Sequence, residues 1–109
     1  MARRLLSVVR ARPVALKSAR AFSHELPDEI SMLRDMCRNF ADNELAPIAG
    51  QIDQEHKFPK EQIDQMFEMG LMGINVPEEF GGAGMNALAY AVACEEISRG
   101  CASAGVIMR

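Results

Sequence analysis

The apolar residues between positions 28 and 52 recur at spacings of three and four, the period of an amphipathic α-helix. Pro27-Asp28-Glu29 suits a first helical turn, because a proline there loses no needed hydrogen bond and carboxylates face the positive end of the helix dipole. Pro47 biases Ala46 away from helical geometry, so we expect a kink or an end at that point. The apolar positions before it are Ile30, Leu33, Cys37, Phe40, Ala41 and Leu45.

A second helix is predicted to begin at Phe58-Pro59 and to end at Gly70, which suits a left-handed C-terminal cap. A third is predicted from about Asn86 to Ser98, with Gly100 ending it, and a fourth from about Ala102. The expected apolar face of the second helix comprises Ile63, Met66, Phe67 and Met69. That of the third comprises Leu88, Ala91, Val92 and Ile97, with Glu95 and Glu96 at the same spacing.

No alternating strand pattern, repeat or low-complexity tract appears along the chain. The body is therefore predicted to be an all-α helical bundle. Seven methionines lie in the body, and adaptable filling of the core is the role we expect of them rather than promiscuous binding. They are Met32, Met36, Met66, Met69, Met72, Met85 and Met108.

The glycine-rich stretch 82–87 formally matches the G-x-G-x-x-A dinucleotide fingerprint. That fingerprint should follow a buried strand directly, yet Pro77, Glu78 and Glu79 intervene, and no acidic ribose partner lies about twenty residues on. We interpret the stretch as a structural turn that admits tight packing before the third helix.

Charge divides the chain into two parts. Residues 1–22 carry six basic residues and no acid, whereas the rest carries six basic and fifteen acidic residues, so the charges of +6 and −9 give the net −3. The first part is typical of a mitochondrial transit peptide, with cleavage expected between Phe22 and Ser23. A basic arm that binds nucleic acid or anionic lipid is the alternative. The prediction is a matrix protein whose mature domain is 23–109, with no transmembrane segment.

The cysteines and histidines do not indicate a metal site. Cys37, Cys94 and Cys101 are odd in number and lack C-x-x-C spacing, which favours free thiols, buried at Cys37 and Cys94. His24 and His56 are far apart and are expected on the surface. Glu95-Glu96 is a poor acid/base pair because adjacent helical residues point about 100° apart, so contacts with Arg99 or a neighbouring segment are favoured.

Two stretches resemble a known family. GLMGINVPEEFGGAGMNALAYAVACEEISRGCAS at 70–103 and PIAGQIDQEHKFP at 47–59 are similar to the N-terminal helical domain of the flavin-dependent acyl-CoA dehydrogenases, most of all to its short-chain (butyryl-CoA) branch. The resemblance runs from about Leu26 to Met108.

The resemblance implies the reaction of a complete enzyme rather than of this chain. Such an enzyme oxidises a short fatty acyl-CoA to trans-2-enoyl-CoA in fatty acid β-oxidation: a carboxylate removes the α-proton and the β-hydrogen leaves as hydride to FAD. Electrons pass to electron-transferring flavoprotein, and the family is tetrameric. Its catalytic glutamate and most flavin contacts belong to later domains, so no catalytic or cofactor-binding residue is expected here. The 109-residue chain alone is predicted to lack dehydrogenase activity and to hold FAD weakly or not at all.

The last predicted helix carries the candidate site residues. Ala102, Gly105, Val106 and Arg109 fall at i, i+3, i+4 and i+7, and the resemblance places them on or near the wall of the acyl-chain pocket. Helix packing alone is the other interpretation of this face. Arg109 departs from the family, where a small or uncharged polar residue is expected, since a guanidinium is costly in an apolar pocket.

A second function class remains open from the sequence. The chain could be a non-enzymatic matrix interaction module, a short isoform that docks on full-length subunits. Exposed apolar surface near the C-terminus, at Val106, Ile107 and Met108, would favour it.

Overall fold

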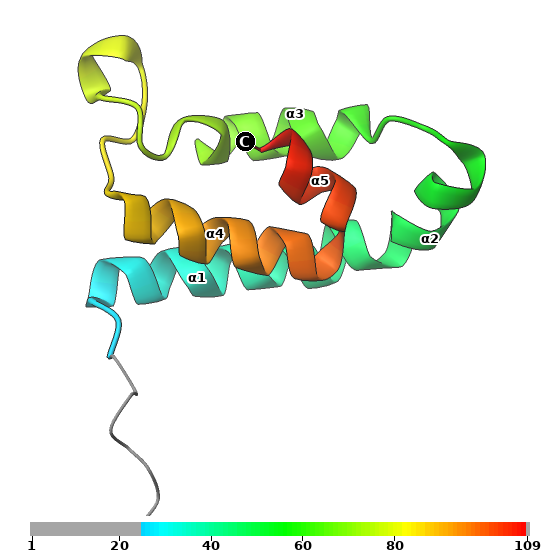
Figure 1. Ribbon diagram of the computed structural model, residues 1–109, viewed down its shortest axis with the longest axis horizontal. Helices are drawn as coiled ribbons and strands as arrows, with labels where there is room; N and C mark the ends of the chain where they lie inside the picture. Colours follow the sequence, from blue (N-terminus) through cyan, green and yellow to red (C-terminus); the bar gives the residue numbers. More distant parts are fainter. Residues whose placement is uncertain (1–24, 109) are drawn as a thin grey trace, which may run out of the picture.

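The computed structural model describes residues 25–108 and is helical, with no β-strand in that part of the chain (Figure 1). This confirms the all-α prediction. None of the helices described there is long and apolar enough to span a membrane. The elements are α1 (Asp28–Phe40), the π-helical turn η2 (Ala41–Leu45), α2 (Ala46–Glu55), α3 (Lys60–Glu68), the 3₁₀ turns η3 (Leu71–Gly73) and η4 (Glu78–Phe80), α4 (Ala87–Gly100) and α5 (Ala102–Ile107).

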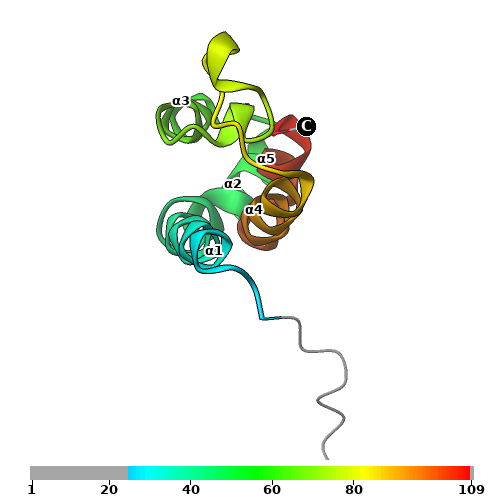
Figure 2. The same ribbon diagram turned by 90° about the vertical axis from the view of Figure 1, so that its left-hand side faces the viewer.

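The first and fourth α-helices form the main packing unit. α1 and α4 lie side by side and run in the same direction, from left to right in Figure 1, while α3 returns on the other side. α5 folds back against α4 (Figure 2) and lies between α4 and α3 in the view of Figure 1. One apolar cluster joins these helices to η3. Its large members are Ile30, Cys37, Phe40, Leu45, Met66, Leu71, Ile74, Val92, Ile97 and Met108.

The passage through Pro47 differs from the prediction. The chain continues from α1 through η2 into α2, and within the π turn the Ala46 N–H donates to the Ala41 carbonyl, five residues back. Ala46 is right-handed helical at φ −59°, ψ −39°, so the expectation that the proline moves it out of helical geometry is wrong. Pro47 lies in the first turn of α2, where its missing N–H needs no partner, and the wider π turn accommodates the change of hydrogen bonding.

Helix ends follow the sequence signals closely. Gly70 adopts the predicted left-handed conformation, at φ 76° and ψ 10°. Asn86 caps α4, its side-chain oxygen accepting a 3.0 Å hydrogen bond from the Ala89 N–H. Gly100 is the last residue of α4 and packs so tightly on η2 that an added Cβ would lie 2.8 Å from both the Cβ and the carbonyl oxygen of Ala41.

Several residues placed on apolar faces are exposed instead. Phe67 has 73% of its surface exposed, and Leu88 and Ala91 are exposed on α4, whereas Ala89 and Ala93 are buried there. The predicted faces are therefore wrong at these positions. The cause is that a helix buries only the part of its surface that meets a neighbour, and the buried arc of α4 runs through Ala89, Ala93 and Ile97 rather than through Leu88 and Ala91.

Candidate functional site

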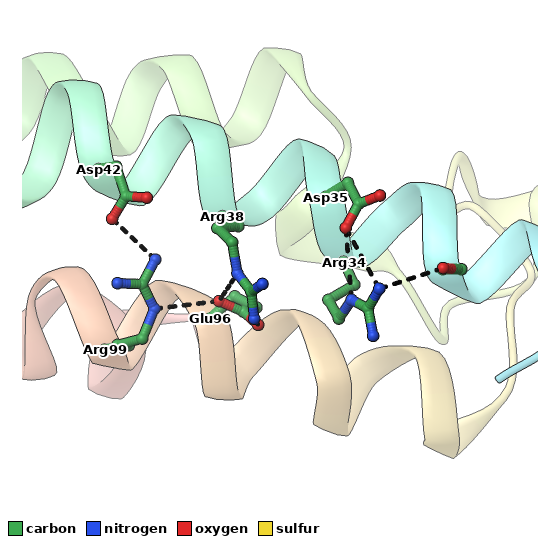
Figure 3. A network of polar contacts seen from close by, with 7 residues as sticks. Arg34, Asp35, Arg38, Asp42, Glu96 and Arg99 are labelled. Carbon is green, nitrogen blue, oxygen red and sulfur yellow. Dashed lines mark hydrogen bonds and ion pairs between the residues drawn. The ribbon is translucent and has the colours of Figure 1, made fainter. Parts of the chain in front are cut away.

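A cluster of four charged side chains joins α4 to α1 and η2 (Figure 3). Glu96 is 5% exposed and accepts two hydrogen bonds from Arg38, from Nε to Oε2 at 3.1 Å and from Nη2 to Oε1 at 2.6 Å. Arg99 donates from Nε to Oε2 of Glu96 at 3.1 Å and from Nη2 to Oδ1 of Asp42 at 2.8 Å. Both oxygens of the buried carboxylate are thus paired with guanidinium groups.

The cluster fixes the charge state of Glu96. Hydrogen bonding to Arg38 is the main cause that holds the pKa of the Glu96 carboxyl below its ordinary value; burial opposes it, and hydrogen bonding to Arg99 lowers the pKa further. A carboxylate held ionised and fully paired is a poor proton acceptor, so the geometry supports a structural role. The prediction that the Glu95-Glu96 pair contacts Arg99 or a neighbouring segment is confirmed for Glu96, which contacts both Arg99 and Arg38 of α1; Glu95 is exposed.

Sequence reasoning did not find the α1 side of this cluster. Arg38 and Asp42 are polar positions one helical turn apart, which the helix period marks only as part of a solvated face. Their partners lie 58 and 57 residues further along the chain. The available signal was the i, i+3 pair of Glu96 and Arg99 on α4.

The glycine-rich loop uses its own backbone amides. The N–H groups of Ala83, Gly84 and Met85 donate to the carbonyls of residues 73, 76 and 74 at 2.8–2.9 Å. A Cβ at Gly82 would overlap the Val76 carbonyl. The loop is therefore the structural turn that the sequence indicated, and amides already bonded in this way do not fit the pyrophosphate of a dinucleotide or flavin.

A hollow of about 430 Å³ opens beside this loop. Phe67 and Phe80, which are 73% and 75% exposed, line it together with Met72, Val76 and the loop residues 81–83. Phe67, which its helical spacing predicts in the core, lines this hollow instead, so the hollow is not apparent from the sequence. Exposed aromatic rings around a concave surface are typical of a place where another surface packs.

The predicted pocket-wall face of α5 is divided between solvent and core. Ala102 and Val106 are exposed, Val106 to 65%, whereas Gly105 is buried against α4. Met108 is also buried, so the expectation that it is exposed is wrong, and Ile107 is half-buried. Arg109 lies outside the described residues, as do Phe22 and Ser23 of the predicted cleavage site.

The thiols are free and differ in burial. Cys37 is fully buried, and this burial, with the nearby Glu96 charge as the lesser cause, raises the pKa of its thiol to about 11. Cys94 is partly exposed, so the prediction that it is buried is wrong, and Cys101 is buried. Residues 25–108 contain no group of histidine, cysteine and acidic side chains arranged to hold a metal ion. His56 is on the surface as predicted; His24 lies outside the described residues.

The methionines are divided between core and surface. Met66 and Met108 are buried, and Met69, Met72 and Met85 pack against the core, in agreement with the role predicted for them. Met32 and Met36 are exposed on α1, so core filling is the wrong interpretation for these two.

Comparison with known proteins gives consistent matches. The family described as "Acyl-CoA dehydrogenase, N-terminal domain" matches residues 27–109. The mitochondrial short-chain specific acyl-CoA dehydrogenase of Bos taurus is 62% identical over 86 residues, which are 79% of this chain and 21% of the relative. The short-chain specific acyl-CoA dehydrogenase of Clostridium acetobutylicum is 45% identical over 83 residues, 76% of this chain and 22% of that protein.

A solved structure agrees with these relatives. One chain of the structure described as "Electron transferring flavoprotein of Acidaminococcus fermentans: Towards a mechanism of flavin-based electron bifurcation" superposes with a TM-score of 0.73 at 37% identity, over 77% of this chain and 22% of that one. The chain thus spans about a fifth of the length of the relatives it matches. It belongs to the acyl-CoA dehydrogenase family and corresponds to that family's N-terminal domain.

Proposed function

We propose that this chain is the N-terminal helical part of a flavin-dependent short-chain acyl-CoA dehydrogenase, an oxidoreductase that converts a short acyl-CoA to its trans-2-enoyl-CoA in fatty acid β-oxidation. The observation that carries the proposal is the 62% identity to the short-chain specific relative from Bos taurus over 86 residues, 79% of this chain. The family match over residues 27–109 and the helical fold support it.

Within that enzyme, we assign this domain one wall of the acyl-chain pocket. Ala102 and Val106 are the residues placed to contact the acyl chain, because they are exposed on the same face of α5. Gly105 contributes by packing against α4, and Arg109, the fourth predicted position, lies outside the described residues. Small side chains at 102 and 105 allow close approach of an apolar ligand.

We expect most contacts to the FAD of the complete enzyme to come from segments other than residues 25–108, because the amides of the glycine loop are already bonded within the chain. This chain alone is expected to be inactive. A flavin peak at one equivalent, or acyl-CoA-dependent dye reduction by purified residues 23–109, would contradict that expectation. The proposed assembly is a homotetramer that passes electrons to electron-transferring flavoprotein.

The proposed location is the mitochondrial matrix. Relatives from Bos taurus and Homo sapiens are described as mitochondrial, and residues 1–22 have the basic, acid-free composition of a transit peptide. Cleavage is proposed between Phe22 and Ser23. Mass spectrometry of the protein from mitochondria should therefore find Ser23 as the first residue.

A chimera tests the proposed activity directly. Residues 26–108 replace the aligned segment of the Bos taurus relative, and the purified chimera is assayed for bound flavin and for dye reduction with butyryl-CoA. We expect stoichiometric flavin and turnover that falls as the acyl chain lengthens. A chimera that binds flavin but oxidises no short acyl-CoA would refute the proposal.

The hollow around Phe67 and Phe80 favours a second candidate, a non-enzymatic interaction module that docks on full-length subunits. Immunoblotting of mitochondrial extract with an antibody against residues 26–69 separates the two. A band several times larger than this chain supports the enzyme, whereas a single band near the size of residues 23–109 supports the module.

A further inference from the structure

Gly105 is the point at which α5 lies closest to α4. A Cβ added at Gly105 would lie 2.9 Å from the Cβ and 3.1 Å from the Cα of Ser98, and would overlap the Ser98 hydroxyl outright. The Sγ atom of Cys94, one turn earlier on α4, lies 3.9 Å from the Gly105 carbonyl oxygen. The backbone of α5 at Gly105 thus packs directly against the side chains of Cys94 and Ser98 on α4.

This contact leaves no room for even one methyl group. Turning the Ser98 hydroxyl to another rotamer would remove the overlap with Oγ, but Cβ and Cα would remain closer than the 3.4 Å at which ordinary contact begins. A larger residue at 105 must therefore push α5 away from α4. Because α5 is a single short helix, Ala102 and Val106 would move with it.

We infer that the pairing of Gly105 with Ser98 sets the acyl-chain length that the enzyme accepts. This inference rests on the proposed function, in which Ala102 and Val106 form a pocket wall. Gly105 and Ser98 are positioning residues: they touch each other rather than the acyl chain, and they determine how far the exposed face of α5 extends into the space beyond it. When α5 lies closer to α4, the proposed pocket on its exposed side is longer and accepts a longer acyl chain.

The test uses the chimera with the Bos taurus relative and compares kcat/KM for butyryl-CoA and hexanoyl-CoA. Gly105→Ala should lower the hexanoyl-to-butyryl ratio about tenfold, the effect of about one methylene in an apolar pocket. The double variant with Ser98→Gly, which removes the hydroxyl and the Cβ and leaves only the Cα at 3.1 Å, should restore most of the ratio. A role in stability alone would lower activity on both substrates equally and would not give a rescue specific to chain length.

The control is Gly50→Ala on α2, where an added Cβ meets nothing within 4 Å, and we expect the ratio to be unchanged. If the Gly105→Ala chimera fails to fold, the single variant Ser98→Gly becomes the deciding test. Without the Ser98 side chain α5 can move closer to α4, so the hexanoyl-to-butyryl ratio of kcat/KM should rise. An unchanged ratio in folded Gly105→Ala, or in Ser98→Gly where that is the deciding variant, overturns the inference. A parent chimera that oxidises neither substrate refutes the proposed function instead.

Discussion

Replacing Glu96 by glutamine keeps the size of the side chain but removes the charge that two arginines share. The carboxylate accepts three hydrogen bonds, at 2.6, 3.1 and 3.1 Å. Glutamine offers one carbonyl oxygen, and its amide N–H groups would face guanidinium donors. At best, the glutamine carbonyl takes the place of Oε2 and keeps the two hydrogen bonds from the Nε atoms of Arg38 and Arg99, both weakened by the loss of charge.

The cost follows from these contacts. A hydrogen bond to a charged group contributes about 1.5–3 kcal/mol, and a neutral one about 1 kcal/mol. Water remains an alternative partner because the Arg38 and Arg99 side chains are half exposed, at 50% and 47%, which reduces the effect. We expect Glu96→Gln to lower the free energy of unfolding by about 2–3 kcal/mol, a large share of the ~5–15 kcal/mol typical of a small domain.

Urea unfolding of the chain, followed by circular dichroism at 222 nm, measures this change. The midpoint should fall by roughly 2 M for a domain of this size. The matched control is Glu95→Gln, the same chemical change at the adjacent, exposed position, for which we expect less than about 0.5 kcal/mol. Equal effects of the two substitutions would refute the assigned role of the cluster.

The pH dependence of the stability difference between the unsubstituted chain and Glu96→Gln gives an independent check. Because the pKa of Glu96 is lower in the folded chain than in the unfolded chain, the stabilisation is present above the unfolded pKa, about 4.3. It is lost as the pH falls through the folded pKa. The stability difference between the unsubstituted chain and Glu96→Gln should therefore be constant near pH 7 and shrink below about pH 4. A difference that persists undiminished at low pH would mean that packing, not charge, stabilises this position.

Three further predictions concern the cysteines, the glycines and a helix cap. Iodoacetamide at pH 8 should alkylate Cys94 before Cys37, because a pKa of about 11 leaves Cys37 about 0.1% ionised and its side chain is buried; equal rates by mass spectrometry would contradict this. Gly100→Ala should destabilise the chain by about 1–3 kcal/mol, because the added methyl group overpacks the contact with Ala41. Gly50→Ala, which has open space around it, should stabilise the chain by about 0.5–1 kcal/mol. Thermal unfolding that ranks the two variants in the opposite order would overturn the packing argument. Asn86→Ala should cost about 1 kcal/mol and Asn86→Asp far less, and an equal loss for both in urea titrations would exclude the capping bond as the cause.

Local signals in the sequence predicted the local structure well. The left-handed Gly70 and the extent of α4 follow from residue chemistry that acts within a few positions. The π turn could not be foreseen in this way. The bias of Pro47 favours an interruption, whereas the structure keeps the chain helical there through a turn in which the Ala46 N–H bonds five residues back and on which Gly100 packs closely.

At the candidate site, too, the sequence predicts the position of residues along a helix but not which neighbour each of them meets. Spacing placed Ala102, Gly105 and Val106 on neighbouring parts of one helix surface, and the structure separates them because Gly105 meets Ser98 while the other two face solvent. The partner of a helix face is a property of tertiary packing, which a period of 3.6 residues does not encode. For the same reason, Phe67 could not be assigned to the hollow from its position on an apolar stripe.

The parallel arrangement of α1 and α4 has a consequence for how the chain is made. Arg38 and its partner Glu96 are separated by 58 residues. The contact between α1 and α4 therefore cannot form until almost the whole domain has been synthesised. At a synthesis rate of about 5–20 residues per second, that wait is about 3–12 s. During this time, the apolar face around Cys37 and Phe40 has no α4 to cover it, and closing so long a loop also slows folding itself. Until α4 is complete, that uncovered apolar face is a place at which the unfinished chain can aggregate.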